Sequence, residues 1–120
     1  MSNVASVHLV EDVLLVAMKE DITDSDILEL QDALAERISS EAVRGVVLDI
    51  SALDIVDTFV GRIIAQLAAI SRLLDAETYL VGMRPAVAMT LVELGMVLPE
   101  IRTALTLSHA MRRLRARRGE

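Results

Sequence analysis

The chain has 120 residues, of which 53% are hydrophobic, 2% aromatic and 25% charged, and its formal net charge is −6. This length predicts one domain over residues 1–120, and the acidic balance argues against nonspecific binding of nucleic acid. The lack of cysteine excludes disulfides and thiol chemistry, and the lack of a signal sequence or a long apolar run predicts a cytoplasmic protein that makes no membrane contact.

The apolar content is high for so small a domain, and the mean hydropathy is +0.49. A monomer of this size cannot bury every apolar side chain, so some apolar surface should face a partner. The alternative is an aliphatic core around a sheet that is buried on both faces, which needs no partner. Of these alternatives the composition favours the first, a homo- or hetero-oligomer.

The first part of the chain predicts a hairpin and a helix. Residues 4–10 and 13–18 are rich in β-branched side chains and are separated by acidic residues, as in a hairpin. Residues 21–40 predict an amphipathic helix, because apolar side chains recur at helical spacing: Ile27, Leu30, Leu34 and Ile38. Thr23, followed by Asp26, predicts a capping box at the start of this helix.

Strands and helices alternate in the rest of the chain. The predicted strands are residues 44–50, 76–82 and 103–107, and the predicted helices are residues 58–74, 85–95 and 108–118. Pro85 should begin its helix, Gly95 should end it, and Ser108 should cap the last helix. The order β-β-α-β-α-β-α-β-α predicts an α/β fold with a mixed sheet, parallel central strands and four helices. Loops at the carboxyl ends of such strands carry function, which directs attention to the segment after Asp49.

That segment, DISALDIVDTFVGR, joins a predicted strand to a predicted helix. On a helical wheel that starts at Thr58, one broad apolar arc should face the sheet: Phe59, Val60, Ile63, Ile64, Leu67, Ile70 and Leu74. Thr58 falls on the opposite side with Arg62, Ala65, Ala69 and Arg72. Its hydroxyl should therefore point to solvent in the first turn, where the helix dipole favours an anion.

Two kinds of chemistry suit this segment. Asp54 and Asp57 could act as an acid–base pair in a suitable pocket, but the sequence offers no base for Thr58 and no Gly-rich phosphate cradle. His8 and His109 are isolated from any second metal ligand, so they are expected to be surface residues and not ligands of a metal. The simpler interpretation is that Asp57 caps the helix and Asp54 lies in a turn. An exposed threonine instead suits modification by a kinase, which would add about −1.5 to −2 charges and create a local electrostatic switch.

The segment VVLDISALDIVDTFVGRII resembles the signature of STAS domains, the fold of bacterial anti-sigma factor antagonists. In that signature a buried strand ends in Asp, a small hydroxyl residue follows two positions later, and an Asp-Ser or Asp-Thr pair opens the next helix. The matching residues are Asp49, Ser51, Asp57 and Thr58. GMRPAVAMTLVELG, residues 82–95, and IRTALTL, residues 101–107, resemble stressosome members of the family, so the resemblance covers nearly the whole chain.

The resemblance is greatest to the single-domain stressosome scaffolds of the RsbS type, and it implies a non-enzymatic protein without a cofactor. It also implies RsbR-type STAS paralogues as partners, an RsbT-type switch kinase that the unmodified scaffold sequesters, and an RsbX-type phosphatase. By resemblance Thr58 is the phosphoacceptor, and Thr90 matches a second phosphothreonine position of RsbR. The implied switch surface comprises Asp49, Ser51, Asp54, Asp57 and Arg62. The alternatives are a STAS module that binds a small ligand or regulates a transporter and, last, a small hydrolase or isomerase.

Overall fold

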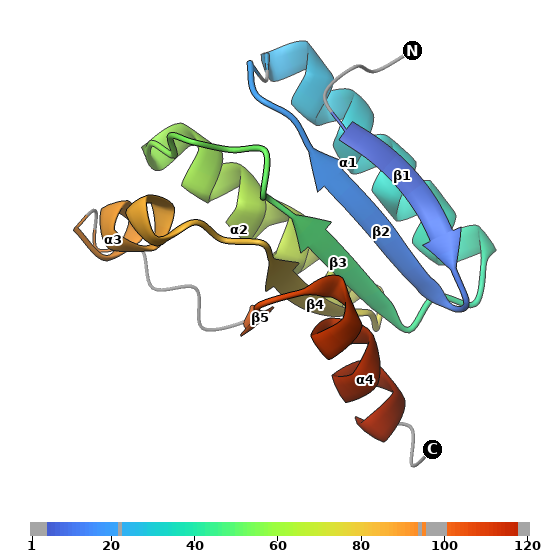
Figure 1. Cartoon of the computed structure of the whole chain (residues 1–120). Helices are drawn as coiled ribbons and strands as arrows, with labels where there is room; N and C mark the ends of the chain where they lie inside the picture. Colours follow the sequence, from blue (N-terminus) through green and yellow to red (C-terminus); the bar gives the residue numbers. More distant parts are fainter. Residues whose placement is uncertain (1–4, 22, 94, 96–100, 118–120) are drawn as a thin grey trace.

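The structure is a computed structural model of the chain, and it describes residues 5–21, 23–93, 95 and 101–117 (Figure 1). The elements in these ranges are β1 (Ala5–Val10), β2 (Val13–Met18), α1 (Asp24–Ser40), β3 (Gly45–Asp49), α2 (Thr58–Leu73), β4 (Glu77–Val81), α3 (Pro85–Glu93), β5 (Arg102–Ala104) and α4 (Leu107–Arg117). This is the order that the sequence predicts.

The strands form one five-stranded sheet in the order β1-β2-β3-β4-β5. β1 and β2 pair antiparallel, whereas the remaining neighbours pair parallel. The predicted mixed sheet with a parallel centre is therefore confirmed. Asp49 pairs in register with Val81, so β3 and β4 end at the same edge of the sheet. Open α/β sheets place their functional loops at this edge.

Helices cover both faces of the sheet. One core cluster lies on the side of α1 and α2, and a second lies on the side of α4. Neighbouring residues of a strand enter opposite clusters, as Val46 and Val47 of β3 do, because side chains alternate along a strand. The apolar positions predicted for α1 are all buried: Ile27, Leu30, Leu34 and Ile38. The doubly covered sheet thus accounts for much of the aliphatic content.

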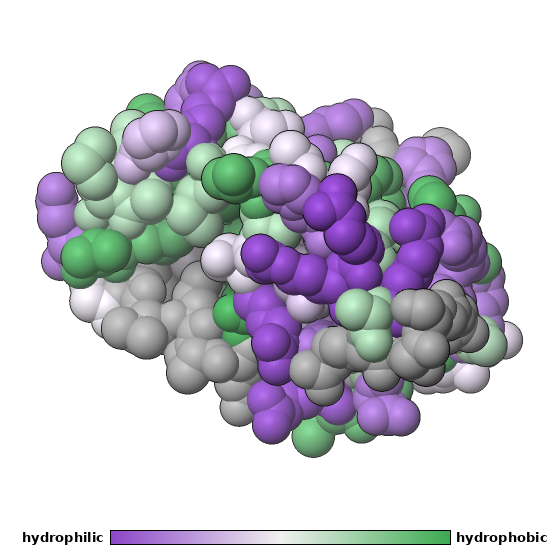
Figure 2. All heavy atoms as spheres, turned by 60° about the horizontal axis from the view of Figure 1, so that its bottom comes forward, coloured by the Kyte–Doolittle hydropathy of each residue, from purple (hydrophilic) through white to green (hydrophobic). Residues whose placement is uncertain are grey.

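Apolar side chains also remain on the surface. Among the described residues, Ile55, Leu73, Val92 and Leu105 are each at least 79% exposed. In Figure 2 apolar residues gather on the α3 side of the molecule, at left, and α3 exposes Met89 together with Val92. No helix in the described ranges is both long and apolar enough to span a membrane. The doubly covered sheet therefore explains part of the composition, and exposed apolar side chains remain outside it.

The capping box predicted for α1 and the ends predicted for α3 are confirmed. The Thr23 hydroxyl accepts from the Asp26 amide and the Asp26 carboxylate accepts from the Thr23 amide, both at 3.2 Å, which completes the capping box. α3 begins at Pro85, and Gly95 follows its end with a φ of 70°. Proline suits a first helical turn and glycine a left-handed helix end, so these boundaries are set by local backbone chemistry.

The predicted start of α4 is wrong. The helix begins at Leu107, and the Thr106 hydroxyl accepts from the amide of His109 at 3.3 Å. Thr106 therefore takes the capping role that was assigned to Ser108. β5 is correspondingly shorter than predicted and ends at Ala104. The error has a physical origin, because either hydroxyl can cap a helix and the sequence contains both within three positions.

α2 buries a different arc from the one that the helical wheel predicts. The prediction holds for Ile63, Ile64 and Leu67, which are buried. Phe59 and Leu74 are instead 39% and 37% exposed. Small residues occupy further buried positions: Gly61, Ala68 and Ser71. Small side chains let the helix backbone lie close to the sheet, and the buried arc of α2 is shifted toward them. The buried Ser71 hydroxyl is satisfied, because it donates to the carbonyl oxygen of Leu67 at 2.8 Å.

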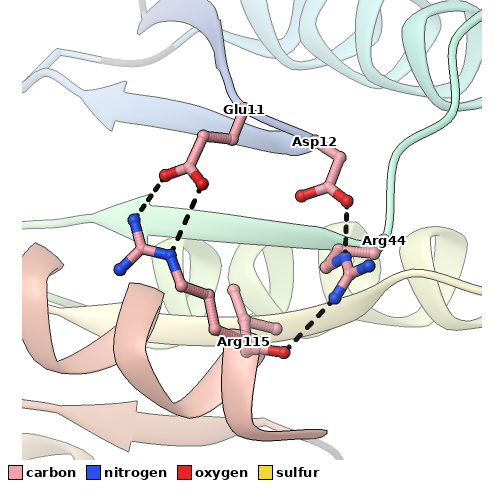
Figure 3. Close-up of polar contacts among 5 residues, drawn as sticks. Glu11, Asp12, Arg44 and Arg115 are labelled. Carbon is pink, nitrogen blue, oxygen red and sulfur yellow. Dashed lines mark hydrogen bonds and ion pairs between the residues drawn. The ribbon is translucent and has the colours of Figure 1, made fainter. Parts of the chain in front are cut away.

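The arginine-rich helix α4 contacts the turn between β1 and β2 (Figure 3). Arg115 forms an ion pair with Glu11. Arg44, which precedes β3, donates from Nε to Asp12 Oδ2 at 2.7 Å and from Nη1 to the carbonyl oxygen of Leu114 at 3.4 Å. Glu11, near the start of the chain, is therefore paired with an arginine near its end, and Arg44 links the same turn to α4.

Candidate functional site

The segment between β3 and α2 begins with a tight local turn. The Asp49 carboxylate accepts from the amide of Ser51 at 2.9 Å, and the Leu53 amide donates to the carbonyl oxygen of Ile50 at 3.0 Å. Asp49 is half-buried and Ser51 is exposed. Asp49 therefore shapes the backbone of the loop, and its Oδ1 is occupied by this hydrogen bond.

The next predicted site lies at the start of α2. Asp57 is the N-cap, and its carboxylate accepts from the Val60 amide at 2.9 Å. This confirms the capping interpretation of Asp57 and provides one of the unpaired amides at the helix end with an acceptor. Thr58 is the first helical residue and is exposed, as the helical wheel predicts. The structure gives its hydroxyl no hydrogen bond to any described residue.

Asp54 binds a residue that sequence reasoning did not select. Its carboxylate forms an ion pair with Nη1 of Arg84, and Nε of the same arginine donates to the carbonyl oxygen of Ser51 at 3.0 Å. Arg84 follows β4, so it reaches across from the neighbouring loop. The available signal was its place in the GMRP stretch, just after a strand that ends at the same edge as β3.

Gly82 lets these loops come together. Its φ is 74°, and a Cβ added there would lie 2.8 Å from Oδ1 of Asp49 and 2.9 Å from Cβ of Ser51. Both values are below ordinary van der Waals contact, so a larger residue would push the loops apart. The glycine is therefore required by its backbone conformation and by the close approach of Asp49.

Arg62 lies one turn after Thr58 and is exposed. Among the described residues it forms no ion pair. It lines a groove of about 420 Å³ between α1 and α2, together with Phe59. Gln31 of α1 donates to Gln66 of α2 at 3.0 Å within the same groove. Arg62 therefore lies on the same helix as Thr58, and it shares the groove with Phe59, which is 39% exposed and does not face the sheet as the helical wheel predicts.

Thr90 lies on a different helix, α3, and is half-buried. Its hydroxyl donates to the carbonyl oxygen of Ala86 at 2.9 Å. A kinase would have to break this bond and turn the side chain outward. The structure therefore separates the predicted acceptors: the hydroxyl of Thr58 is unengaged, whereas that of Thr90 is engaged.

The carboxylates of Asp54 and Asp57 both bind other parts of the chain. Asp57 caps α2 and Asp54 binds Arg84, so their geometry matches a helix cap and a loop contact rather than an acid–base pair. The described residues contain no group of His, Cys, Asp and Glu side chains arranged to hold a metal. A depression of about 260 Å³ at this edge is lined partly by Lys19, Glu20 and Asp54. Its lining also includes the apolar residues Leu53, Ile55 and Val60, and its volume lies just below the range of about 300–1,000 Å³ that is typical of small-molecule sites.

The family comparison matches residues 5–110 to the STAS domain. The structure of RsbS from Moorella thermoacetica, in a variant with one serine-to-glutamate change, is 34% identical, with coverage of 97% of this chain and 98% of that one and a TM-score of 0.82. A chain from the molecular architecture of the stressosome, described as a signal integration and transduction hub, is also 34% identical, with coverage of 94% and 98% and a TM-score of 0.82.

RsbRA of Bacillus subtilis (strain 168), an RsbT co-antagonist protein, is 34% identical over 102 residues, or 78% of this chain. The chain spans only 29% and 37% of the lengths of the curated relatives that it matches. The family match covers most of the chain, and the strand, turn and helix cap around Thr58 have the arrangement that the signature predicts. The chain therefore belongs to the STAS domain family.

Proposed function

We propose that this chain is a non-enzymatic scaffold of a stressosome-like assembly, which holds an RsbT-type switch kinase and releases it when Thr58 is phosphorylated. The likeness to RsbS and to the stressosome chain supports the scaffold role. The relatives named RsbT co-antagonists support the kinase as a partner and RsbR-type paralogues as members of the assembly. The proposal adds an RsbX-type phosphatase that removes the phosphate, and a location in the cytoplasm, where ATP is available.

The observation that carries the proposal is the environment of the Thr58 hydroxyl. It is exposed in the first turn of α2, and Asp57 already supplies the cap that this helix needs. Modification of Thr58 would therefore cost no hydrogen bond to a described residue. The positive end of the helix dipole also favours an anion there, by about 0.3–1 kcal/mol.

A phosphate on Thr58 should act on a docked partner and not on the fold of this chain. It would add about −1.5 to −2 charges directly after Asp57, the carboxylate that caps α2. A partner surface that is acidic or apolar would then meet a stronger negative field and lose affinity. Because the fold does not depend on the hydroxyl, release should occur with little change in the backbone.

The direct test is phosphorylation by the cognate RsbT-type kinase with ATP and Mg²⁺, followed by mass spectrometry of the peptides. We expect phosphate on Thr58 in the wild-type chain and none on this peptide in Thr58→Ala. Thr90→Ala is the matched control and should be modified as the wild type is, because the Thr90 hydroxyl is bonded to Ala86. Transfer to other residues alone, or no transfer, would contradict the proposal.

A binding measurement tests the switch itself. Thr58→Ala should retain the kinase, whereas Thr58→Asp should weaken its capture, since Asp places a negative charge at the start of α2. Both variants should unfold at nearly the same urea concentration as the wild type, which separates a lost contact from a lost fold. Equal kinase affinity for the two variants would show that charge at this position does not control release.

A further inference from the structure

Arg84 connects the start of α3 to the segment between β3 and α2. Its carbonyl oxygen accepts from the amides of Val87 and Ala88, both at 3.0 Å, so its backbone opens helix α3. Its side chain extends instead to the segment between β3 and α2, where it contacts Ser51 and Asp54. One residue therefore starts α3 and holds the segment that leads into Thr58.

The two side-chain contacts differ in kind, and together they fix the orientation of the guanidinium group. Nε donates to a backbone carbonyl oxygen, that of Ser51, at 3.0 Å, while Nη1 pairs with the carboxylate of Asp54. The planar fork of arginine can make both contacts at once, whereas lysine presents a single ammonium group. The contact to Ser51 also restrains the backbone directly, which an ion pair between side chains would not do.

The held segment runs directly into the phosphoacceptor. Leu53 and Val56 are 2% exposed and anchor the segment from inside. Asp54, between them, is exposed and is tied from outside by Arg84. The next residue after Val56 is Asp57, the cap of α2, and Thr58 follows. Loss of the Arg84 contacts would leave the exposed part of this segment with fewer restraints, directly before Thr58.

We propose that Arg84 is a positioning residue for phosphoryl transfer to Thr58, a role that rests on the proposed function. In this transfer the Thr58 oxygen forms a bond to the γ-phosphorus of ATP. The bond from that phosphorus to the leaving oxygen of ADP breaks, and the hydroxyl proton passes to a base of the kinase. Arg84 takes no part in these bonds. It keeps the segment before α2 in the conformation that presents the hydroxyl, and small misplacements of a reacting group are costly.

The test compares Arg84→Gln and Arg84→Lys with the matched control Arg113→Gln. Arg113 also donates to a backbone carbonyl oxygen, that of Thr103 at 2.8 Å, but it lies on α4. The kcat and KM of the kinase are measured with each variant as substrate, together with amide hydrogen exchange over residues 52–58. Urea unfolding followed by circular dichroism checks that each variant folds.

We expect Arg84→Gln to lower kcat by about fivefold, the order of effect of losing one exposed ion pair, with KM nearly unchanged. Exchange over residues 52–58 should become faster. Arg84→Lys should fall between Arg84→Gln and the wild type, and Arg113→Gln should match the wild type in both measurements. Asp54→Asn should lose less than Arg84→Gln, because the contact to the Ser51 carbonyl remains, and combining the two changes should add little.

Several outcomes would overturn the role of Arg84. Unchanged exchange over residues 52–58 in Arg84→Gln would show that the side chain does not hold the segment, and an unchanged kcat would show that holding it is irrelevant to transfer. A rise in KM alone would mean that Arg84 contacts the kinase directly. A wild-type chain that the kinase leaves unmodified at Thr58 would instead refute the proposed function, and the positioning role with it.

Discussion

Replacing Gly82 by alanine should destabilise the fold more than the same change at Gly95. Both glycines have a left-handed backbone, with φ of 74° and 70°. A Cβ at Gly82 would meet Asp49 Oδ1 at 2.8 Å and Ser51 Cβ at 2.9 Å, whereas a Cβ at Gly95 meets no described atom within 4 Å. The two variants therefore share the backbone cost and differ in crowding.

The magnitudes can be estimated separately. A left-handed conformation costs a non-glycine residue about 1–2 kcal/mol, which is the loss expected for Gly95→Ala. Crowding of a packed position adds about 1–3 kcal/mol, so Gly82→Ala should lose about 2–5 kcal/mol in all. Asp49 cannot easily move away from an added Cβ, because its Oδ1 accepts a hydrogen bond from the Ser51 amide at 2.9 Å. We therefore expect most of the crowding to remain.

Urea unfolding measures this difference. Far-UV circular dichroism is the suitable signal, since the chain has no tryptophan and a single tyrosine. The protein concentration must be the same for all samples, because assembly would raise the apparent stability. With a slope of about 2 kcal/mol per M, a difference of about 2 kcal/mol between the variants separates their midpoints by about 1 M urea. Equal midpoints for the two variants, at equal slopes, would refute the close approach of the two loops.

Two further predictions concern buried polar groups and ion pairs. The hydroxyl of Thr78 is buried without a partner among the described residues, so Thr78→Val should raise the free energy of unfolding by about 1 kcal/mol in the same assay; a decrease would reveal a hydrogen bond to this hydroxyl. Arg44→Ala should lower the free energy of unfolding by about 1–3 kcal/mol, because the Arg44 side chain is only 21% exposed and donates both to Asp12 and to a backbone carbonyl of α4. Arg115→Ala should cost less than about 1 kcal/mol, since the side chains of Arg115 and Glu11 are 49% and 51% exposed, and 1 M NaCl should remove most of this cost. Equal and equally salt-sensitive losses for the two arginine variants would contradict the assigned difference in burial.

The elements and the exposed position of Thr58 could be predicted from the sequence because their signals are local. A capping box, a proline at a first helical turn and periodic apolar side chains each act over a few residues. The exposure of Thr58 follows from the same local rules, since an aspartate cap fixes where α2 begins and Thr58 is its first residue. Alternation of strands and helices then allows few topologies, and the parallel centre of the sheet follows.

Contacts between distant segments required the tertiary structure. Arg84 and Asp54 are 30 residues apart, and Arg115 and Glu11 are 104 apart. Many arginines and carboxylates in the sequence could have paired equally well, and no local rule selects among them. The exposure of Phe59 has a similar cause, because small residues of α2 decide which side of the helix approaches the sheet. Periodicity and capping thus determined what the elements are and that Thr58 is exposed at the start of α2, whereas three-dimensional packing alone decided which distant side chains contact one another.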